Sequence, residues 1–113
     1  MLDIREDKGF VFENFVYLVL KEKLGGSYKI YFWRTKAGAE VDFIILKDLK
    51  PIAIEAKAKY FKKPAITQSM RSFINTYKPK TAFIINLNLN DEIKLNGCLI
   101  RFISTESFVE GSL

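Results

Sequence analysis

Three side chains, Asp42, Glu55 and Lys57, place two carboxylates and an amine within two neighbouring apolar segments of the chain. Residues 40–46 and 51–58 are rich in β-branched and aromatic residues, which is typical of β-strands. A charged side chain in such a segment is costly unless it is paired or bound to a cation. These three residues are therefore the first candidates for chemistry.

The polar stretch 47–50 predicts the loop of a β-hairpin. A four-residue loop sets a register that places Asp42 opposite Glu55 and Glu40 opposite Lys57. Because side chains alternate along a strand, these four then share one face, unless a β-bulge shifts the register. The opposite face is predicted to be core and consists of Val41, Phe43, Ile45, Ile54 and Ala56.

Two opposed carboxylates repel each other, and partial burial disfavours their charged forms further. A divalent cation compensates both costs and keeps sites for water and phosphate oxygens. The sequence has no histidine and one cysteine, Cys98, which excludes His-dependent nucleophilic catalysis and the usual zinc sites. We therefore expect Mg²⁺ or Mn²⁺, with Lys57 stabilising negative charge or positioning water. The alternative is an ordinary Glu40–Lys57 ion pair beside exposed acids.

Glu13 lies within the most apolar stretch of the chain, residues 10–20. Apolar residues recur at helical spacing across residues 9–23, which predicts a helix that is buried on more than one side. Packing of this helix over the sheet would bring Glu13 to the acids of the hairpin. The alternative is that the helix dipole favours an acid near the helix start.

The middle of the chain is basic, with twelve Lys/Arg against four Asp/Glu between residues 29 and 80. This excess favours a polyanionic partner such as DNA, although a lysine-rich solvated surface is the alternative. We expect the following residues to contact phosphates without reading sequence: Lys36, Lys59, Lys62, Lys63, Gln68 and Arg71. For Gln68 and Arg71, a solvated helix face is the competing interpretation.

The pattern of elements predicts one mixed α/β (α+β) domain over residues 1–113, with its core at about 8–103. Residues 1–8 are expected to be a loose or helical lead-in, and Gly25–Gly26 to end the first helix. Further elements are expected as strands at 28–33, 40–46, 51–58, 82–85 and 98–103, a helix at 65–77, and loops at 86–90 and 94–97. The helix between the third and fourth strands predicts a crossover that makes these strands parallel in a mixed sheet.

Glu13, Asp42 and Glu55-Ala56-Lys57, taken in this order, resemble the motif of the PD-(D/E)xK (restriction-endonuclease-like) nuclease superfamily. The order helix, three strands, helix, strand resembles the core of that superfamily, although Val41 stands where its proline would be. Residues 8–14, 32–35, 38–43 and 54–57 also resemble the C-terminal domain of unknown function of archaeal and bacterial AAA-type P-loop ATPases. This resemblance covers about residues 8–86.

The resemblance implies a DNA-cleaving domain in which Asp42 and Glu55 hold the metal, with the Ala56 carbonyl as a further ligand. It also implies catalytic roles for Lys57 and Glu13, and an ATPase domain as a partner in a longer protein, with a stand-alone relative as the alternative. Residues 25–27 lack the lysine and the spacing of a phosphate loop, so no ATP site is expected in this chain.

Two other functions stay open: a non-catalytic appendage of the ATPase that binds nucleic acid or protein, and a homodimerisation domain that uses the many aromatic residues. The charged N-terminus and the lack of a membrane-length apolar run predict a cytoplasmic protein without membrane contacts.

Overall fold

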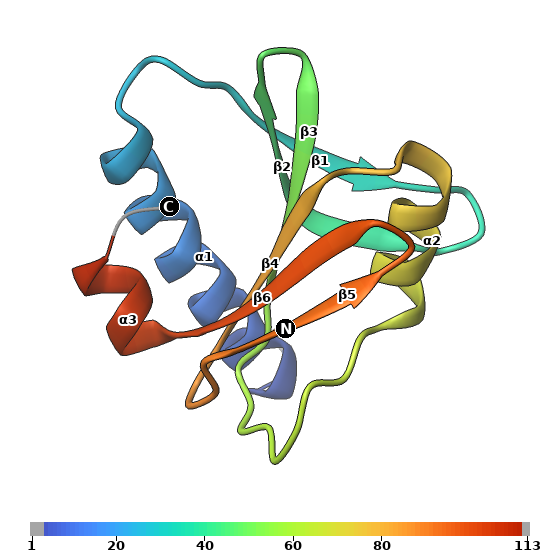
Figure 1. Cartoon of the computed structure of the whole chain (residues 1–113). Coiled ribbons are helices and arrows are strands. Elements are labelled where there is room, and N and C mark those ends of the chain that lie inside the picture. The colour runs from blue at the N-terminus through green and yellow to red at the C-terminus, as the bar shows by residue number, and fades with distance from the viewer. Residues whose placement is uncertain (1–3, 112–113) are drawn as a thin grey trace.

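The computed structural model describes residues 4–111, in which a six-stranded mixed sheet carries helices on both faces (Figure 1). The elements are α1 (Ile4–Leu24), β1 (Ile30–Arg34), β2 (Glu40–Lys47), β3 (Lys50–Ala56), α2 (Gln68–Tyr77), β4 (Thr81–Asn86), β5 (Asp91–Leu95), β6 (Cys98–Ser104) and α3 (Thr105–Glu110). The strand order is β1-β2-β3-β4-β6-β5, in which β3, β4 and β6 run parallel and the other pairs are antiparallel. The predicted α/β class and the parallel β3–β4 pair are confirmed.

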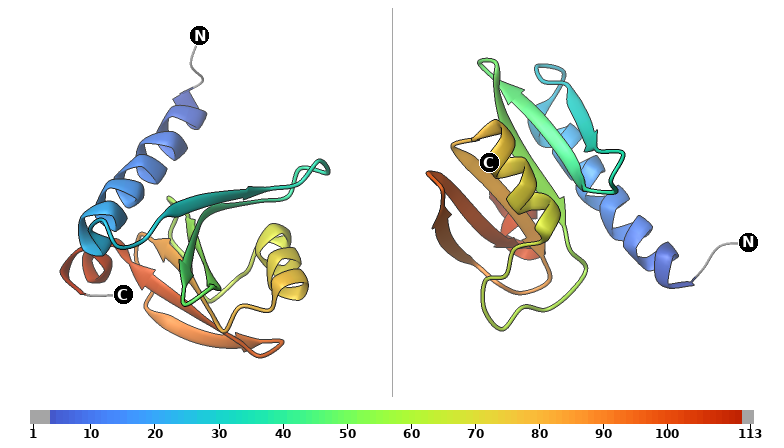
Figure 2. Two further views of the ribbon diagram at one scale, coloured as in Figure 1. Left: turned by 90° about the horizontal axis from the view of Figure 1, so that it is seen from above. Right: turned by 90° about the vertical axis from the view of Figure 1, so that its right-hand side faces the viewer.

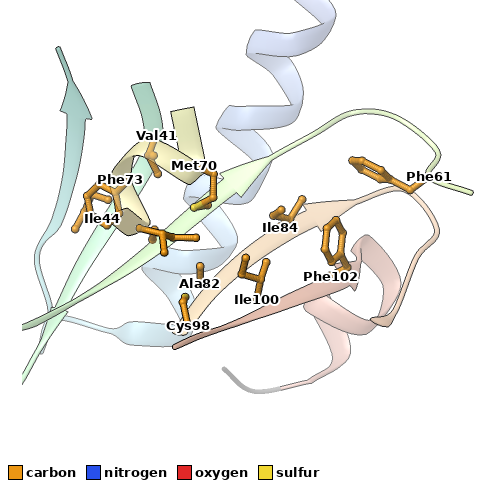
Figure 3. Close-up of a cluster of buried hydrophobic side chains, with 12 residues drawn as sticks. Val41, Ile44, Phe61, Met70, Phe73, Ala82, Ile84, Cys98, Ile100 and Phe102 are labelled. Atoms are coloured by element: carbon orange, nitrogen blue, oxygen red, sulfur yellow. The ribbon is translucent and has the colours of Figure 1, made fainter. Parts of the chain in front are cut away.

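Two apolar layers lie on the two faces of the sheet. The α2-side core fills the space under α2 (Figure 3) and consists of Val41, Ile44, Ala53, Phe61, Met70, Phe73, Ile74, Ala82, Ile84, Cys98, Ile100 and Phe102. The α1-side core lies under α1 and α3 and consists of Val16, Leu20, Phe43, Ile45, Ile54, Ala56, Phe83, Ile85 and Phe108. Each large side chain that is fully buried contributes about 1.5–3 kcal/mol, so these layers fix how the helices sit on the sheet.

Helix α1 is longer than predicted, since it begins at Ile4 instead of residue 9. Its N-terminal half extends beyond the sheet (Figure 2). It ends at Leu24 because Gly25 adopts φ +62° and donates its backbone N–H to the Lys21 carbonyl at 3.0 Å, as the glycine pair predicted. Of the expected lead-in, residues 1–3 lie outside the described residues.

The β2–β3 hairpin has the predicted register but a shorter turn. Leu46 faces Pro51 as expected, and the ladder continues to the pair Lys47–Lys50. The turn is therefore Asp48–Leu49, with φ of +52° and +66°, which is the two-residue geometry that matches strand twist. The four-residue loop was wrong, while the register it implied was right.

Other boundaries differ from the sequence prediction for local reasons. Helix α2 begins at Gln68 instead of residue 65, because Thr67 caps it. Strand β5 includes residues that were assigned to a loop, and α3 was not predicted. Cys98 is buried within the α2-side core. Within residues 4–111, no helix combines the length and apolarity needed to cross a bilayer.

Candidate functional site

The pairing of β1 with β2 is irregular close to the candidate acid of β2. Tyr31 faces Ile44 but Trp33 faces Val41, so β2 contains one residue more than β1 between these two pairs. Regular alternation would place Val41 and Phe43 on one face, but Val41 belongs to the α2-side core and Phe43 to the α1-side core. The predicted face of Val41 was therefore wrong, because the irregularity reverses the alternation there.

The Asp42 carboxylate is bound by its own hairpin and by α1. It accepts a hydrogen bond from the Ala56 backbone N–H at 2.8 Å, and it is hydrogen-bonded to the Glu13 carboxyl group. Burial raises the pKa of Asp42, while the Ala56 N–H, the charge of Lys57 and the Glu13 hydrogen bond oppose that rise. Asp42 therefore has partners from two elements that are distant in sequence.

Glu13 is the second acid of this contact, and its pKa is raised. Burial, then the charge of Asp42 and the hydrogen bond to it, raise the pKa of Glu13 from 4.5 to about 7. Burial also raises the pKa of Asp42, so both acids of this contact favour the protonated form more than free carboxyl groups do. Two carboxyl groups in contact share a proton because both cannot ionise cheaply. We call them the Glu13–Asp42 pair.

Glu55 is held from the opposite side, by α2. Glu55 is 2% exposed, and its Oε1 accepts a hydrogen bond from the Thr67 hydroxyl at 2.9 Å. Its Oε2 is buried and has no hydrogen-bond partner in the described part of the chain. Burial raises the pKa of Glu55, and the Lys57 charge and the Thr67 hydroxyl oppose that rise. Burying a carboxylate oxygen without a hydrogen-bond partner costs free energy of folding, and a nearby cation offsets this cost.

Lys57 supplies a positive charge that acts on all three acids, Glu13, Asp42 and Glu55. Its backbone N–H donates to the Ile85 carbonyl at 2.8 Å, which extends the β3–β4 ladder beyond Ala56 and fixes the backbone. Its ammonium lies 4.0 Å from Glu55 Oε2, and its side chain is 37% exposed. Its positive charge lowers the pKa of Glu13, Asp42 and Glu55. We call Glu55 and Lys57 the Glu55–Lys57 pair.

The predicted residues therefore meet in one region, but as two pairs and not as one cluster on a single face. Asp42 turns to Glu13 of α1, whereas Glu55 turns to Thr67 at the start of α2. Across residues 4–111, no three acidic or thiol side chains gather as a group that could hold a metal ion. Glu13 lies against Asp42, as the packing of α1 over the sheet predicted, and a shared role of Glu13 with Glu55 stays a prediction.

The two alternative interpretations, a Glu40–Lys57 ion pair and a helix-dipole role for Glu13, do not agree with the structure. Glu40 forms its ion pair with Arg34 at 3.2 Å, and not with Lys57. Glu13 lies far from the start of α1, which begins at Ile4, so the helix dipole does not explain it.

Thr67 is a functional residue that the sequence reasoning missed. Its hydroxyl accepts a hydrogen bond from the Met70 backbone N–H at 3.0 Å, which caps α2, and donates to Glu55. A threonine directly before an apolar helical pattern is a helix-start signal, so the sequence did contain a clue.

The predicted phosphate-binding residues lie around the site in different degrees. Lys59 lines a hollow of about 240 Å³ together with Glu55, Lys57 and Thr67, and its ammonium lies 4.7 Å from the Phe61 ring centre. The others are exposed on the surface: Lys36 in the turn before β2, Lys62 and Lys63 in the loop before α2, and Gln68 and Arg71 on α2. Their contact with phosphate stays a prediction.

Fold and site together define a small mixed α/β domain with paired carboxylates and a lysine at the end of a hairpin. The sequence profile of DUF4143, a domain of unknown function, matches residues 8–107, so the chain belongs to the DUF4143 family. Among curated proteins, no relative matches it.

One solved structure similar in fold is a chain of the refined half-complex from a tetradecameric assembly of Thermococcus gammatolerans McrB AAA+ hexamers with bound McrC. The TM-score is 0.68 at 14% sequence identity, over 85% of this chain. This chain spans 27% of the length of that chain, and the likeness concerns the fold alone.

Proposed function

We propose that this domain is a metal-dependent nuclease that hydrolyses DNA phosphodiester bonds and works beside an AAA-type ATPase. The observation that carries the proposal is Glu55 Oε2, a buried carboxylate oxygen without a hydrogen-bond partner, 4.0 Å from the Lys57 ammonium. A protein tolerates such an atom where a ligand completes it.

The proposed ligands are of the type that suits a hard divalent cation. Carboxylates of Asp42 and Glu55, with the Ala56 backbone carbonyl, are the oxygen ligands that Mg²⁺ or Mn²⁺ takes in proteins. When bound, such an ion supplies Lewis-acid activation of water and neutralises charge on the phosphate. The Ala56 N–H holds the Asp42 carboxylate at 2.8 Å and the Thr67 hydroxyl holds Glu55 at 2.9 Å, so both acids are oriented before any ligand arrives.

Lys57 acts on the substrate side of the site. Its side chain is 37% exposed and its ammonium is close to Glu55. From there it can bind a non-bridging phosphate oxygen and stabilise the negative charge that develops during attack. Lys59, which lines the same hollow, extends positive charge along the path of the DNA backbone.

Two similarities support the ATPase partner. The first is the DUF4143 family match, which agrees with the resemblance of this sequence to ATPase-attached domains. The second is the fold, which is similar to that of a chain in an assembly of AAA+ hexamers. We infer that the domain acts as a module of a longer ATPase system, since this sequence has no phosphate loop of its own.

A second candidate function is a non-catalytic appendage of the same ATPase that binds nucleic acid or protein. The observation in its favour is that no three metal-holding side chains gather in the described residues, while burial raises the pKa of Glu13, Asp42 and Glu55. A site that keeps its acids protonated and apart binds metal weakly.

Calorimetry with Mn²⁺ followed by a supercoiled-plasmid cleavage assay tests the proposal. We expect the wild-type protein to bind Mn²⁺ and to nick the plasmid, and Asp42→Asn to lose both while keeping an oxygen that can accept from Ala56 N–H. Glu92→Gln is the matched control. Glu92 is an exposed acid on β5, the edge strand farthest from β1, and it forms an ion pair with Arg101 of β6. Absence of Mn²⁺ binding at millimolar concentration in the wild type rejects the nuclease, and DNA binding without cleavage supports the appendage.

A further inference from the structure

An apolar groove of about 360 Å³ adjoins the site on the side of α1. It lies between α1 and strands β1 and β2, and is lined by Phe10, Glu13, Asn14, Tyr17, Phe32 and Phe43. Phe10 is 67% exposed and Phe32 is 74% exposed, although exposed phenylalanine normally costs solubility. The groove therefore presents aromatic rings to solvent next to the acid that contacts Asp42.

Two aromatic rings of the groove contact the buried Phe43. Tyr17 stacks on Phe43 with ring centres 5.9 Å apart, and Phe32 is tilted against Phe43 with ring centres 6.1 Å apart. Phe32 is itself exposed, which leaves it accessible to a further ring. Flat aromatic ligands stack on such a surface with little conformational cost.

Polar groups accompany the rings at two positions. The Asn14 amide and the Glu13 carboxyl group line the groove and can bind the hydrogen-bonding edge of a base. Arg34 lies two residues beyond Phe32 on the same face of β1, and its guanidinium is engaged by Glu40 on the surface. An exposed ion pair of this kind is weak, so a phosphate can replace Glu40 as the partner of Arg34.

We propose that this groove binds one unpaired nucleobase of a single-stranded nucleic acid, with Phe32 and Phe10 stacking on the base and Arg34 binding the neighbouring phosphate. This inference rests on the proposed function for its biological sense, because Glu13 joins the groove to Asp42 and so places the bound strand beside the cleavage site. Bases within a duplex are already stacked, whereas every unpaired base offers a face to an aromatic ring. The groove thus selects single-stranded segments, flaps or frayed ends.

Fluorescence anisotropy with a labelled ten-nucleotide oligothymidylate and with a duplex of equal length tests the inference. The measurements are made in EDTA, so that binding is read without cleavage. Phe32→Ala and the double variant Phe10→Ala/Phe32→Ala are compared with Tyr31→Ala. Tyr31 is the matched control, because it is a half-exposed aromatic residue on the same strand whose side chain turns to the opposite face.

We expect Phe32→Ala to weaken binding of the oligothymidylate by about 5- to 150-fold, the loss typical of one base–aromatic stack. Tyr31→Ala should bind as the wild type does, and binding of the duplex should change less than twofold in every variant. Equal affinity of wild type and Phe32→Ala for the oligothymidylate overturns the inference, as does a wild type that does not bind it.

Two further measurements, self-association and metal-dependent cleavage, distinguish base binding by the groove from a protein interface and from the proposed nuclease activity. If Phe32→Ala abolishes a self-association seen by sedimentation and leaves oligothymidylate binding unchanged, the groove is a protein interface and the inference is wrong. If metal-dependent cleavage persists while Phe32→Ala binds normally, the inference fails and the nuclease stands. If Phe32→Ala loses single-strand binding in a protein that never cleaves, the groove stands and the nuclease fails.

Discussion

The Glu13–Asp42 pair and the Glu55–Lys57 pair resolve the same problem, a buried acid, by different means. Asp42 shares a proton with Glu13, whose pKa is about 7, and accepts the Ala56 N–H. Glu55 faces an ammonium at 4.0 Å and keeps one oxygen without a hydrogen-bond partner. The first pair satisfies both of its acids within the protein, whereas the second leaves Glu55 Oε2 without a hydrogen-bond partner. The proposed metal site therefore depends on the α2 side more than on the α1 side.

The largest expected effect concerns metal affinity. Glu55→Gln removes the charge of the unpartnered carboxylate, so we expect its Mn²⁺ affinity to fall by more than about 100-fold, as the loss of a direct ligand does. Glu13→Gln keeps Asp42 ionisable and should lower Mn²⁺ affinity less than about tenfold. Calorimetry at pH 7.5 compares the two. Equal losses in both variants contradict the distinction between the pairs.

The second effect concerns the support of Glu55 by α2. Thr67→Ala removes both the cap of α2 and the hydrogen bond to Glu55, so we expect the free energy of unfolding to fall by about 1–2 kcal/mol. Thr67→Ser retains a hydroxyl and should restore most of this loss. Urea denaturation followed by circular dichroism measures both. A full loss in Thr67→Ser would show that the methyl group, and not the hydroxyl, is responsible.

The third effect has the opposite sign. Burial raises the pKa of Glu55, so the folded state disfavours its charged form and loses stability as the pH rises through that pKa. Glu55→Gln removes this loss, and we expect a gain of about 1 kcal/mol at pH 8 that is smaller at pH 5. Glu92→Gln, at an exposed ion pair, should stay within about 0.5 kcal/mol of the wild type at both pH values. A loss of stability in Glu55→Gln would mean that Lys57 compensates the charge in full.

The smallest effect is a titration. Carbon-detected NMR of the Glu13 carboxyl group should give a midpoint about pH 7. In Asp42→Asn the midpoint should move towards 4.5, because the charge that repels ionised Glu13 is gone. Stability contributed by Glu13 is full below its ordinary pKa of 4.5 and is lost as the pH rises through about 7. Stability should thus fall less steeply across this interval in Glu13→Gln, and an unchanged slope would separate Glu13 from Asp42.

The hairpin shows which structural features local sequence can predict. The polar break between two apolar segments was enough to give the β2–β3 register, because a register error would move apolar side chains to solvent. The two-residue turn was not predicted, since Asp48–Leu49 lacks the glycine usual in such turns. Strand β5 was missed although Asn96–Gly97, with φ of +50° and +81°, is a hairpin signal.

The irregular pairing beside Asp42 is a feature that local sequence does not predict. It depends on how β1 pairs with β2, and no glycine or proline in β2 marks it. This pairing reverses the face of Val41 and separates the direction of Asp42 from that of Glu55. The spacing of residues along β2 therefore indicated which acids belong to the site, but not which residues they contact.

The amino-acid sequence by itself determined the available chemistry: carboxylates and amines without histidine, on a hairpin whose register follows from its apolar pattern. Tertiary structure decided how that chemistry is divided. The pKa of Glu13 is raised because α1 buries it against Asp42, and Glu55 has an unpartnered oxygen because Thr67 satisfies only the other one. Burial and hydrogen-bond partners set the charge of an acid, and here they come from helices distant from the hairpin in sequence.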